Sequence, residues 1–124
     1  MKIHVMLVDD DKDELTFFLD ALKEVPSEDG FKCTYASNAK QAREMLKYLV
    51  PDFIFVDFKM PEMNGLQTAR VLKRIMPTTP LLMFTSHLVP NLEEEAASAG
   101  IQRVVSKSDG APAVMSAIRS LLAA

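Results

Sequence analysis

Acidic side chains gather directly behind the first apolar run of the chain. The segment VMLVDDDKDE, residues 5–14, places Asp9, Asp10, Asp11 and Asp13 within five consecutive positions. Such carboxylates could bind Ca²⁺ in a loop, could include the nucleophile of a phosphatase, or could hold Mg²⁺ for an aspartate elsewhere in the chain. The rest of the sequence must distinguish these three kinds of site.

Other polar residues that suit phosphoryl chemistry follow later apolar runs. Asp57 follows FIFV, Thr85 and Ser86 end LLMFTS, and Lys107 follows RVVS. A carboxylate can become an aspartyl phosphate, whereas a hydroxyl and an ammonium can hold phosphoryl oxygens. Mg²⁺ prefers oxygen ligands, and it neutralises charge on a transferring phosphoryl group. These residue types therefore favour phosphoryl transfer if the fold brings them together.

Short apolar runs alternate with amphipathic stretches, and this order predicts how the polar residues are positioned. We expect strands at residues 3–8, 31–36, 53–56, 81–85 and 103–106. A helical spacing of apolar residues follows each strand, with Pro and Gly residues between the elements. The pattern predicts an α/β domain with a doubly wound, five-stranded parallel sheet and five helices.

The carboxyl ends of parallel strands meet at one edge of the sheet, where ligands bind. The residues Asp9 and Asp10, Asp57, Thr85 and Lys107 follow four different predicted strands. We therefore expect three acids, a hydroxyl and an amine to converge at this edge.

The bulk composition indicates one compact domain, residues 1–124, with a real hydrophobic core. The single cysteine, Cys33, excludes an internal disulfide; it is expected to be buried and inert, and it fits a reducing, cytoplasmic location. No segment resembles a signal peptide, and no apolar run is long enough for a membrane helix.

The net charge of −3 is unevenly distributed. Residues 1–62 carry 13 acids and 8 bases, whereas residues 63–124 carry 4 acids and 6 bases. No basic stripe stands out along the sequence, so direct nucleic-acid binding is not expected. A monomer is the default expectation.

The segment FIFVDFKMPEMNG, residues 53–65, resembles the phosphoacceptor segment of bacterial response regulator receiver domains. The residues that match the family pattern are Asp57, Met60, Pro61, Met63, Asn64 and Gly65. The segments LVDDD at 7–11, FTS at 84–86 and VVSKS at 104–108 extend the resemblance over the whole chain.

The resemblance implies a flavodoxin-like fold with strand order 2-1-3-4-5, and it implies that Asp57 is the phosphorylated residue. By the same resemblance, Asp10 and Asp57 would bind Mg²⁺ directly, together with the backbone carbonyl of Lys59. Asp9 would act largely through metal-bound water.

Four further roles follow from the resemblance. Thr85 would hydrogen-bond the phosphoryl group, and Lys107 would pair with Asp57 and then with the phosphate. Lys59 and His87 occupy positions that tune the lifetime of the phosphoryl group in the family. We therefore expect these two side chains to alter the access of attacking water.

The calcium-loop interpretation fits the alternate positions of Asp9, Asp11 and Asp13. However, Glu14 stands where an EF-hand needs Gly for its sharp turn, and Asp20 stands where it needs a bidentate Glu. The segment before Asp9 also predicts a strand, where an EF-hand needs a helix.

The phosphatase interpretation rests on Asp9-x-Asp11, which resembles the start of haloacid-dehalogenase-type hydrolases. Asp13 stands where that family continues to Thr or Val, and DFKMPEMNG would be left unexplained. We therefore expect the acids at 9–10 to hold a metal for Asp57. Asp11 and Asp13 are expected to cap the first helix.

Two positions depart from the receiver pattern. Ser108 follows Lys107, where most receivers have a proline after a cis bond, so we expect a trans bond here. Val104 stands where a switch aromatic is common. We therefore predict a weaker or different conformational response on the face formed by the fourth helix, the fifth strand and the fifth helix.

These observations predict a single-domain, chemotaxis-regulator-like response regulator of a two-component system. It would accept a phosphoryl group from a histidine kinase or a histidine phosphotransfer protein and would signal to an unidentified output protein. It would catalyse only its own phosphorylation and dephosphorylation, so it is not expected to be a turnover enzyme. The alternatives are a receiver-like binding module that no longer switches, an aspartate-nucleophile phosphatase, or a fragment of a longer regulator.

Overall fold

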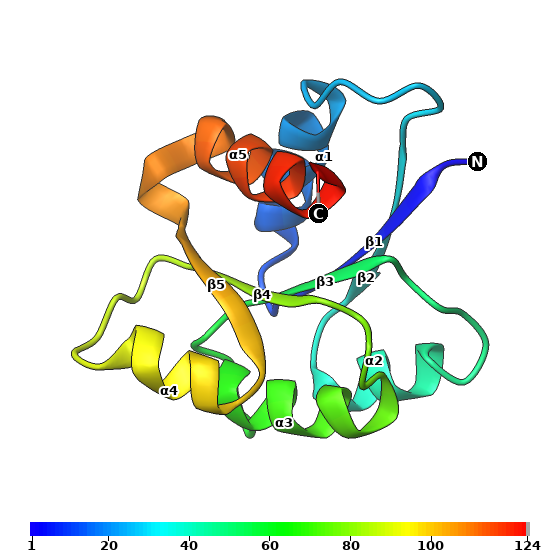
Figure 1. Ribbon diagram of the computed structural model, residues 1–124. Coiled ribbons are helices and arrows are strands. Elements are labelled where there is room, and N and C mark those ends of the chain that lie inside the picture. Colours follow the sequence, from blue (N-terminus) through cyan, green and yellow to red (C-terminus); the bar gives the residue numbers. More distant parts are fainter. Residues whose placement is uncertain (124) are drawn as a thin grey trace.

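The computed structural model describes residues 1–123 and contains one parallel sheet of five strands. The strands follow the order β2-β1-β3-β4-β5, as expected from the resemblance (Figure 1). Their bounds are β1 (Ile3–Val8), β2 (Phe31–Ala36), β3 (Phe53–Val56), β4 (Leu81–Thr85) and β5 (Ile101–Ser106). The predicted doubly wound α/β fold is confirmed.

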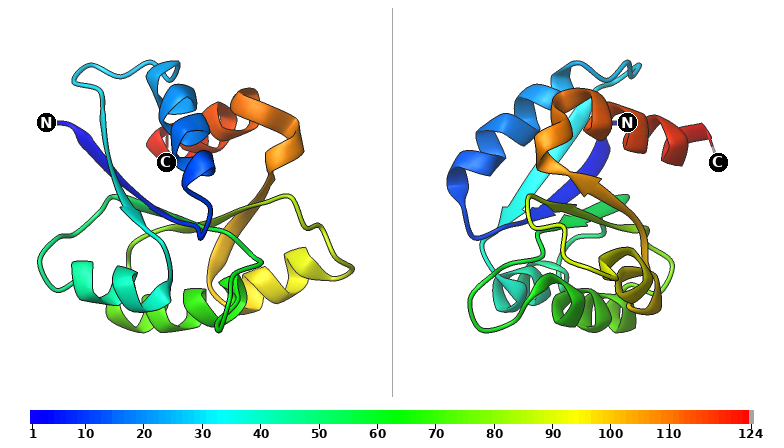
Figure 2. Two further views of the ribbon diagram at one scale, coloured as in Figure 1. Left: turned by 180° about the vertical axis from the view of Figure 1, so that it is seen from behind. Right: turned by 90° about the vertical axis from the view of Figure 1, so that its left-hand side faces the viewer.

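Five helices cover the sheet on both faces. They are α1 (Lys12–Lys23), α2 (Ala39–Met45), α3 (Gly65–Ile75), α4 (Leu92–Ser98) and α5 (Gly110–Ala123), and a short 3₁₀ turn (Lys107–Asp109) precedes α5. Helices α1 and α5 lie on one face, whereas α2, α3 and α4 lie side by side on the other (Figures 1 and 2). The strands carry apolar residues on both sides because both faces are covered.

The alternation of side chains along each strand divides the core into two halves. Leu7, Phe55 and Phe84 are fully buried against α1 and α5, where Phe18 packs edge-on against Phe55 with 5.0 Å between the ring centroids. The neighbouring strand residues point the other way and build the core beneath α2, α3 and α4; they include Met6, Val8, Ile54, Val56 and Met83. The sheet is therefore packed between two apolar cores, one on each face.

Strand β5 begins two residues earlier than the apolar pattern predicted. Ile101 pairs with Leu81 and is buried, but the next pair joins Leu82 to Arg103, so the register shifts between them. Gln102 is the extra residue of this irregularity. The polar pair Gln102–Arg103 interrupts the apolar run, so the apolar pattern alone does not show that the strand starts at Ile101.

Side-chain caps fix the beginnings of three helices close to the carboxyl edge. Asp11 caps α1 by accepting a hydrogen bond from the backbone N–H of Asp13, as predicted. Asn38 accepts from Gln41 N at the start of α2. Asn64 and Gln67 form a reciprocal capping box at the start of α3. Each of these helices therefore begins at a residue whose side chain satisfies a free backbone N–H group.

The remaining expectations from composition are only partly met. Cys33 is partly exposed rather than buried, because β2 is an edge strand. Partial burial still raises the pKa of its thiol to about 11, so the thiol stays protonated and unreactive at neutral pH. Within residues 1–123, no helix combines the length and the apolar character that crossing a membrane requires.

Candidate phosphoacceptor site

Three carboxylates converge at the carboxyl edge of the sheet. Asp9 and Asp10 follow β1, Asp57 follows β3, and one oxygen of each side chain lies within 4.8 Å of the others. Asp9 and Asp57 are buried, whereas Asp10 is exposed. The sheet therefore brings together the acids that the sequence placed at the ends of different strands.

Backbone hydrogen bonds hold the two buried aspartates in place. The N–H of Asp57 donates to Val8 O at 2.9 Å, and the N–H of Asp9 donates to Ala36 O at 3.0 Å, so both residues continue the strand pairing. One carboxylate oxygen of Asp57 accepts from Phe58 N at 2.9 Å, and one of Asp9 accepts from Asp11 N at 3.0 Å. Each carboxylate keeps a second oxygen for other partners.

Lys107, from the end of β5, places its ammonium among these acids. Its Nζ lies 2.8 Å from Asp9 Oδ2, 3.6 Å from Asp57 Oδ1 and 3.8 Å from Glu14 Oε1. It also lies 5.5 Å from the centroid of the Phe84 ring. The pair with Asp57 that the resemblance predicts is present as an ion pair, and a shorter contact, a hydrogen bond, joins Lys107 to Asp9 as well.

Burial and the repulsion between carboxylates shift the pKa values of the site residues. Burial raises the pKa of the Asp57 carboxyl, and the Asp9 carboxylate adds to this rise while Lys107 opposes it. Burial also raises the pKa of Asp9, against the hydrogen bond from Lys107. Burial alone would lower the pKa of Lys107, but Asp9, Asp57 and Glu14 outweigh it and raise that pKa. The lysine therefore stays charged at neutral pH.

This donor set fits a hard divalent cation. Carboxylate oxygens are the preferred protein ligands of Mg²⁺, which usually keeps several waters as well. The exposed carboxylate of Asp10 opens the cluster to solvent, so a partly hydrated ion can enter. A bound cation would also relieve the repulsion between Asp9 and Asp57.

A cavity of about 510 Å³ lies beside the acids and contains most of the predicted site residues. Its walls include Asp9, Asp10, Asp11, Glu14, Asp57, Lys59, Met60, Pro61, Ser86, His87 and Lys107. Lys59 and His87 therefore do flank the acids. Thr85 is fully buried at the end of β4, and its Oγ1 accepts a hydrogen bond from His87 N at 3.0 Å.

The loop after Lys107 differs from the proline-containing loop of the family pattern. No peptide bond among residues 1–123 is cis, so the Lys107–Ser108 bond is trans, as expected. Ser106 caps the 3₁₀ turn by accepting from Ser108 N, and the hydroxyls of Ser106 and Ser108 lie 2.7 Å apart. These serine contacts define the course of the chain on both sides of Lys107.

Gly65 allows the phosphoacceptor loop to pass close to α3. A Cβ built on Gly65 would lie 2.2 Å from the carbonyl oxygen of Asp57 and 2.8 Å from Phe58 Cα. The N–H of Gly65 donates to Phe58 O at 2.6 Å. The glycine in MPEMNG is therefore required for space directly behind Asp57.

Two residues of the site were missed by sequence reasoning. Glu14, in the first turn of α1, lies 3.8 Å from the Lys107 ammonium. The hydroxyl of Tyr35 donates to the Asp9 backbone carbonyl at 2.6 Å. The signal for Glu14 was its position in the first turn of a helix that starts at the acidic loop. Tyr35 could have been found only from the pairing of β1 with β2.

The surrounding structure also contradicts the calcium-loop interpretation. The residues before Asp9 form strand β1, and α1 begins at Lys12, so the acids lie between a strand and a helix. An EF-hand loop lies between two helices.

The family model of the response regulator receiver domain matches residues 5–119. The chemotaxis protein CheY of Halobacterium salinarum is 30% identical over 124 residues, which cover the whole of both chains. The transcriptional activator protein ExaE of Pseudomonas putida is 29% identical over 94 residues, which cover 76% of this chain.

Other relatives are much longer than the part that this chain matches. The chain spans 44% of ExaE. It spans 23% of the protein-glutamate methylesterase/protein-glutamine glutaminase 2 of Photobacterium profundum, to which it is 36% identical over 101 residues. The activities named for those longer proteins therefore belong to them and are not assigned to this chain.

Solved structures share the fold over nearly the whole chain. A response regulator from Thermotoga maritima superposes with a TM-score of 0.86, at 21% identity and full coverage of both chains. CheY4 of Vibrio cholerae gives a TM-score of 0.85 at 20% identity and covers 98% of this chain and 99% of its own. This likeness shows the fold, and the matching family model shows where the chain belongs.

Proposed function

Because the chain belongs to the response regulator receiver family, we propose that Asp57 accepts a phosphoryl group from a phosphohistidine of a histidine kinase or a histidine phosphotransfer protein. We further propose that residues 1–124 act as one receiver domain in the cytoplasm. Phosphorylation would change the affinity of this domain for an output protein. The domain would act catalytically only on its own phosphorylation and hydrolysis.

One observation carries the proposal: a buried aspartate lies beside a lysine and two further carboxylates on a shared sheet edge. The free oxygen of Asp57 would attack phosphorus, forming a P–O bond as the P–N bond to the donor histidine breaks. Lys107 would shift from Asp9 toward the new phosphoryl oxygens, and the Thr85 hydroxyl would donate to one of them.

The three acids fit Mg²⁺, which supplies neutralisation of the charge on the transferring group when it is bound. Asp10 and Asp57 would be its direct carboxylate ligands, with the backbone carbonyl of Lys59 as a third. Asp9, which is already held by Lys107 and Asp11 N, would act through a metal-bound water.

Intact-mass measurement after incubation with acetyl phosphate tests this function. We expect a gain of one phosphate with Mg²⁺, no gain with EDTA, and a modified peptide that contains Asp57. No gain from acetyl phosphate or from a phosphorylated histidine phosphotransfer domain, with Mg²⁺ binding intact, would reject phosphoryl transfer. The chain would then be a receiver-like module that binds without switching, the function that Val104 and Ser108 would favour.

Replacing Lys107 by Met is expected to change two properties in opposite directions. Phosphorylation should slow by about 100-fold, because a preorganised cation that stabilises the phosphoryl oxygens is lost. Mg²⁺ should bind about tenfold more tightly, because the cation closest to the acids is removed. Stopped-flow phosphorylation and calorimetric metal titration measure the two effects.

The exposed variant Lys12→Met is the control for Lys107→Met, since it removes the same charge at the start of α1. It should leave both properties within about twofold of wild type. Weaker Mg²⁺ binding in Lys107→Met would show that the lysine supports the metal site rather than competing with the metal.

Lys59 and His87 are expected to set the lifetime of the phosphoryl group. Both line the cavity that Asp57 also lines. In Lys59→Ala and His87→Ala, we expect the hydrolysis rate of the phosphorylated protein to change by about three- to tenfold, because removing either side chain opens the approach of water. Loss of the added phosphate, followed by intact mass, gives the rate. Unchanged rates in both variants would contradict this role.

A further inference from the structure

Helices α2 and α3 concentrate positive charge on an otherwise acidic protein. Residues 39–50 and 65–76 together carry 6 bases and 1 acid, a net charge of +5. Since the whole chain carries −3, the remaining residues carry −8. The bases are dispersed over two separate segments, so they form no basic stripe in the sequence. The fold places the two helices next to each other on one face of the sheet (Figure 1).

Most of these cations are free to bind a partner. Lys40, Arg43, Arg70 and Arg74 are exposed, and none of them forms an ion pair with another residue in the range 1–123. We call the surface formed by these four residues the basic α2–α3 surface. Arg70 and Arg74 stand one turn apart on α3, so they lie on the same side of that helix.

The other two bases already have partners. Lys47 binds Glu44, the single acid of the two segments, at 3.0 Å. Lys73 turns its ammonium toward the Thr79 carbonyl at 3.4 Å, and its side chain packs against Gly100. Glu62 is a further acid at this surface, since it lines a small cavity with Lys40 and Arg43. The basic α2–α3 surface therefore keeps an excess of positive charge.

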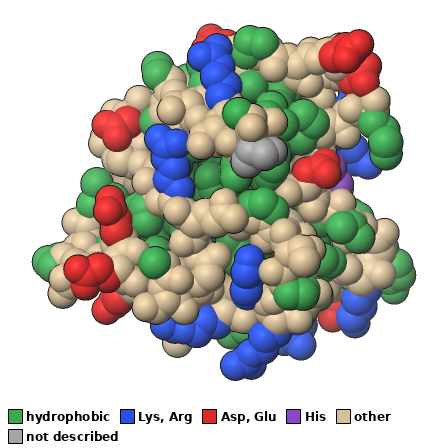
Figure 3. Space-filling view, in the orientation of Figure 1, with side chains coloured by type: hydrophobic (Ala, Val, Ile, Leu, Met, Phe, Trp, Pro, Cys, Tyr) green, Lys and Arg blue, Asp and Glu red, His purple; other side chains and the backbone are tan. Residues whose placement is uncertain are grey.

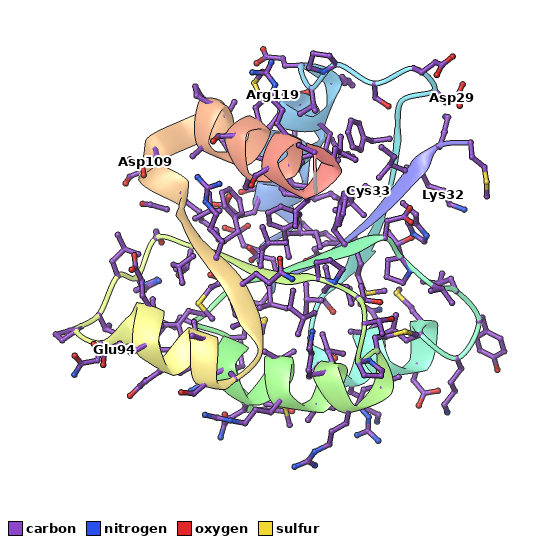
Figure 4. The ribbon with its side chains drawn as sticks, in the orientation of Figure 1. Asp29, Lys32, Cys33, Glu94, Asp109 and Arg119 are labelled. Carbon is purple, nitrogen blue, oxygen red and sulfur yellow. The ribbon has the colours of Figure 1, made fainter. Side chains whose placement is uncertain are left out.

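The opposite charge lies at the other end of the same helical layer. Glu93, Glu94 and Glu95 occupy the first turn of α4, and Figure 4 labels Glu94 at the outer side of that helix. The space-filling view shows blue Lys and Arg side chains along the lower rim, over α3 and α2, and red side chains over α4 (Figure 3). An acidic ligand would therefore be directed to α2 and α3 and kept away from α4.

Exposed apolar side chains accompany the cations. Tyr48 is 87% exposed and Val50 is 73% exposed in the segment after α2, and Ile75 is 41% exposed at the end of α3. Both helices return to the amino edge of the sheet, so their last residues lie at the same end of the layer. Tyrosine and arginine are enriched at protein interfaces and supply much of their binding energy.

We propose that the basic α2–α3 surface binds an acidic, apolar-containing segment of a partner protein. Arginine side chains bind carboxylates through two parallel hydrogen bonds. Exposed Tyr48 and Val50, which follow α2, and exposed Ile75, which follows Arg74 in α3, offer apolar contacts on the same two segments. A nucleic acid fits less well, because it is an extended polyanion and the surface offers only four free cations. The rest of this chain, whose net charge is −3, is mostly acidic and would repel the phosphates.

The proposal does not depend on phosphoryl transfer, since none of the four cations lines the cavity beside Asp57. An Asp57→Asn protein should therefore bind the acidic segment as wild type does. This variant separates a failure of the proposed docking surface from a failure of the proposed phosphorylation.

Fluorescence anisotropy with a labelled peptide of repeating Glu-Glu-Leu tests the proposal. The variant Arg43→Gln, Arg70→Gln, Arg74→Gln should bind the peptide at least about tenfold more weakly than wild type. The control Lys2→Gln, Lys32→Gln, Arg119→Gln makes the same charge change at exposed positions elsewhere, two of which are labelled in Figure 4. The control should stay within about twofold of wild type, and added salt should weaken binding by screening.

Three results would overturn the proposal. Equal weakening in the variant and in the control would show that only net charge matters. Tighter binding of single-stranded oligothymidylate, or of phosphatidylglycerol vesicles, at the same three arginines would assign the surface to another class of partner. The absence of saturable peptide binding to wild type at low salt would show that the surface does not take acidic segments.

Discussion

An Asp57→Asn protein is expected to lose phosphorylation completely and to unfold at a higher temperature than wild type in metal-free buffer near neutral pH. The loss follows because an amide is not a nucleophile toward a phosphoryl group at this pH. The gain in stability follows because the replaced carboxylate is buried beside Asp9. The Asn side chain can still accept the hydrogen bond from Phe58 N.

The pH dependence of this stability difference follows from the direction of the pKa shift. Burial, and then Asp9, raise the pKa of Asp57 in the folded state above its unfolded value. The folded state therefore binds the proton of Asp57 more tightly than the unfolded state does. Proton binding stabilises the fold fully below the unfolded pKa, and this stabilisation is lost as the pH rises through the folded pKa. The advantage of Asn should thus be full above the folded pKa and should vanish in more acidic buffer.

Thermal unfolding measured across the acidic to neutral range checks this expectation, with Asp20→Asn as the matched control. Asp20 is exposed on α1, and its only ion pair among the described residues is a contact of 3.8 Å with Lys23. The control should change neither stability nor phosphorylation noticeably. A lower melting temperature for Asp57→Asn at neutral pH would mean that the ionised carboxylate stabilises the fold, which would contradict the electrostatic account.

A Gly65→Ala protein is expected to lose about 3 kcal/mol of unfolding free energy, because the added methyl overlaps the backbone. Its Cβ would lie 2.2 Å from the Asp57 carbonyl oxygen, a contact that only movement of the backbone could relieve. Since the displaced backbone carries Asp57, phosphorylation should also slow by about 100-fold. Denaturant unfolding and acetyl phosphate labelling measure the two effects.

Gly30→Ala provides the contrasting glycine. It has a φ of +82°, but nothing lies within 4 Å of a Cβ built there. The left-handed backbone alone should reduce stability by about 1 kcal/mol, and phosphorylation should stay unchanged because Gly30 lies in the loop before β2. If both substitutions had equal effects on stability and phosphorylation, Gly65 would not be needed for the close approach of the backbone behind Asp57.

Much of the fold was predictable because its signals are local. The period of apolar residues gave four of the five strands with their observed bounds, since a strand covered on both faces is a continuous apolar run. The start of β5 was missed because Gln102 and Arg103 are polar residues in a strand whose register shifts. The helix cap at Asp11 was correct because capping depends on neighbours only a few positions away.

The convergence of the site residues was predictable from topology alone. Parallel strands share one carboxyl edge, so residues that follow different strands must approach one another. This argument placed Asp9, Asp10 and Asp57 together, and the structure brings one oxygen of each within 4.8 Å of the others. Their roles in phosphoryl transfer and metal binding remain predictions that the experiments above address.

The sequence by itself thus determined the class of fold, the family and the identity of the acids, because these depend on local patterns and on strand ends. Only the tertiary structure decided which acid holds Lys107, why Gly65 must lack a side chain, and that bases from α2 and α3 form one surface. These features depend on distances between segments far apart in the chain. Such distances are fixed by the packing of helices on the sheet, which no local pattern contains.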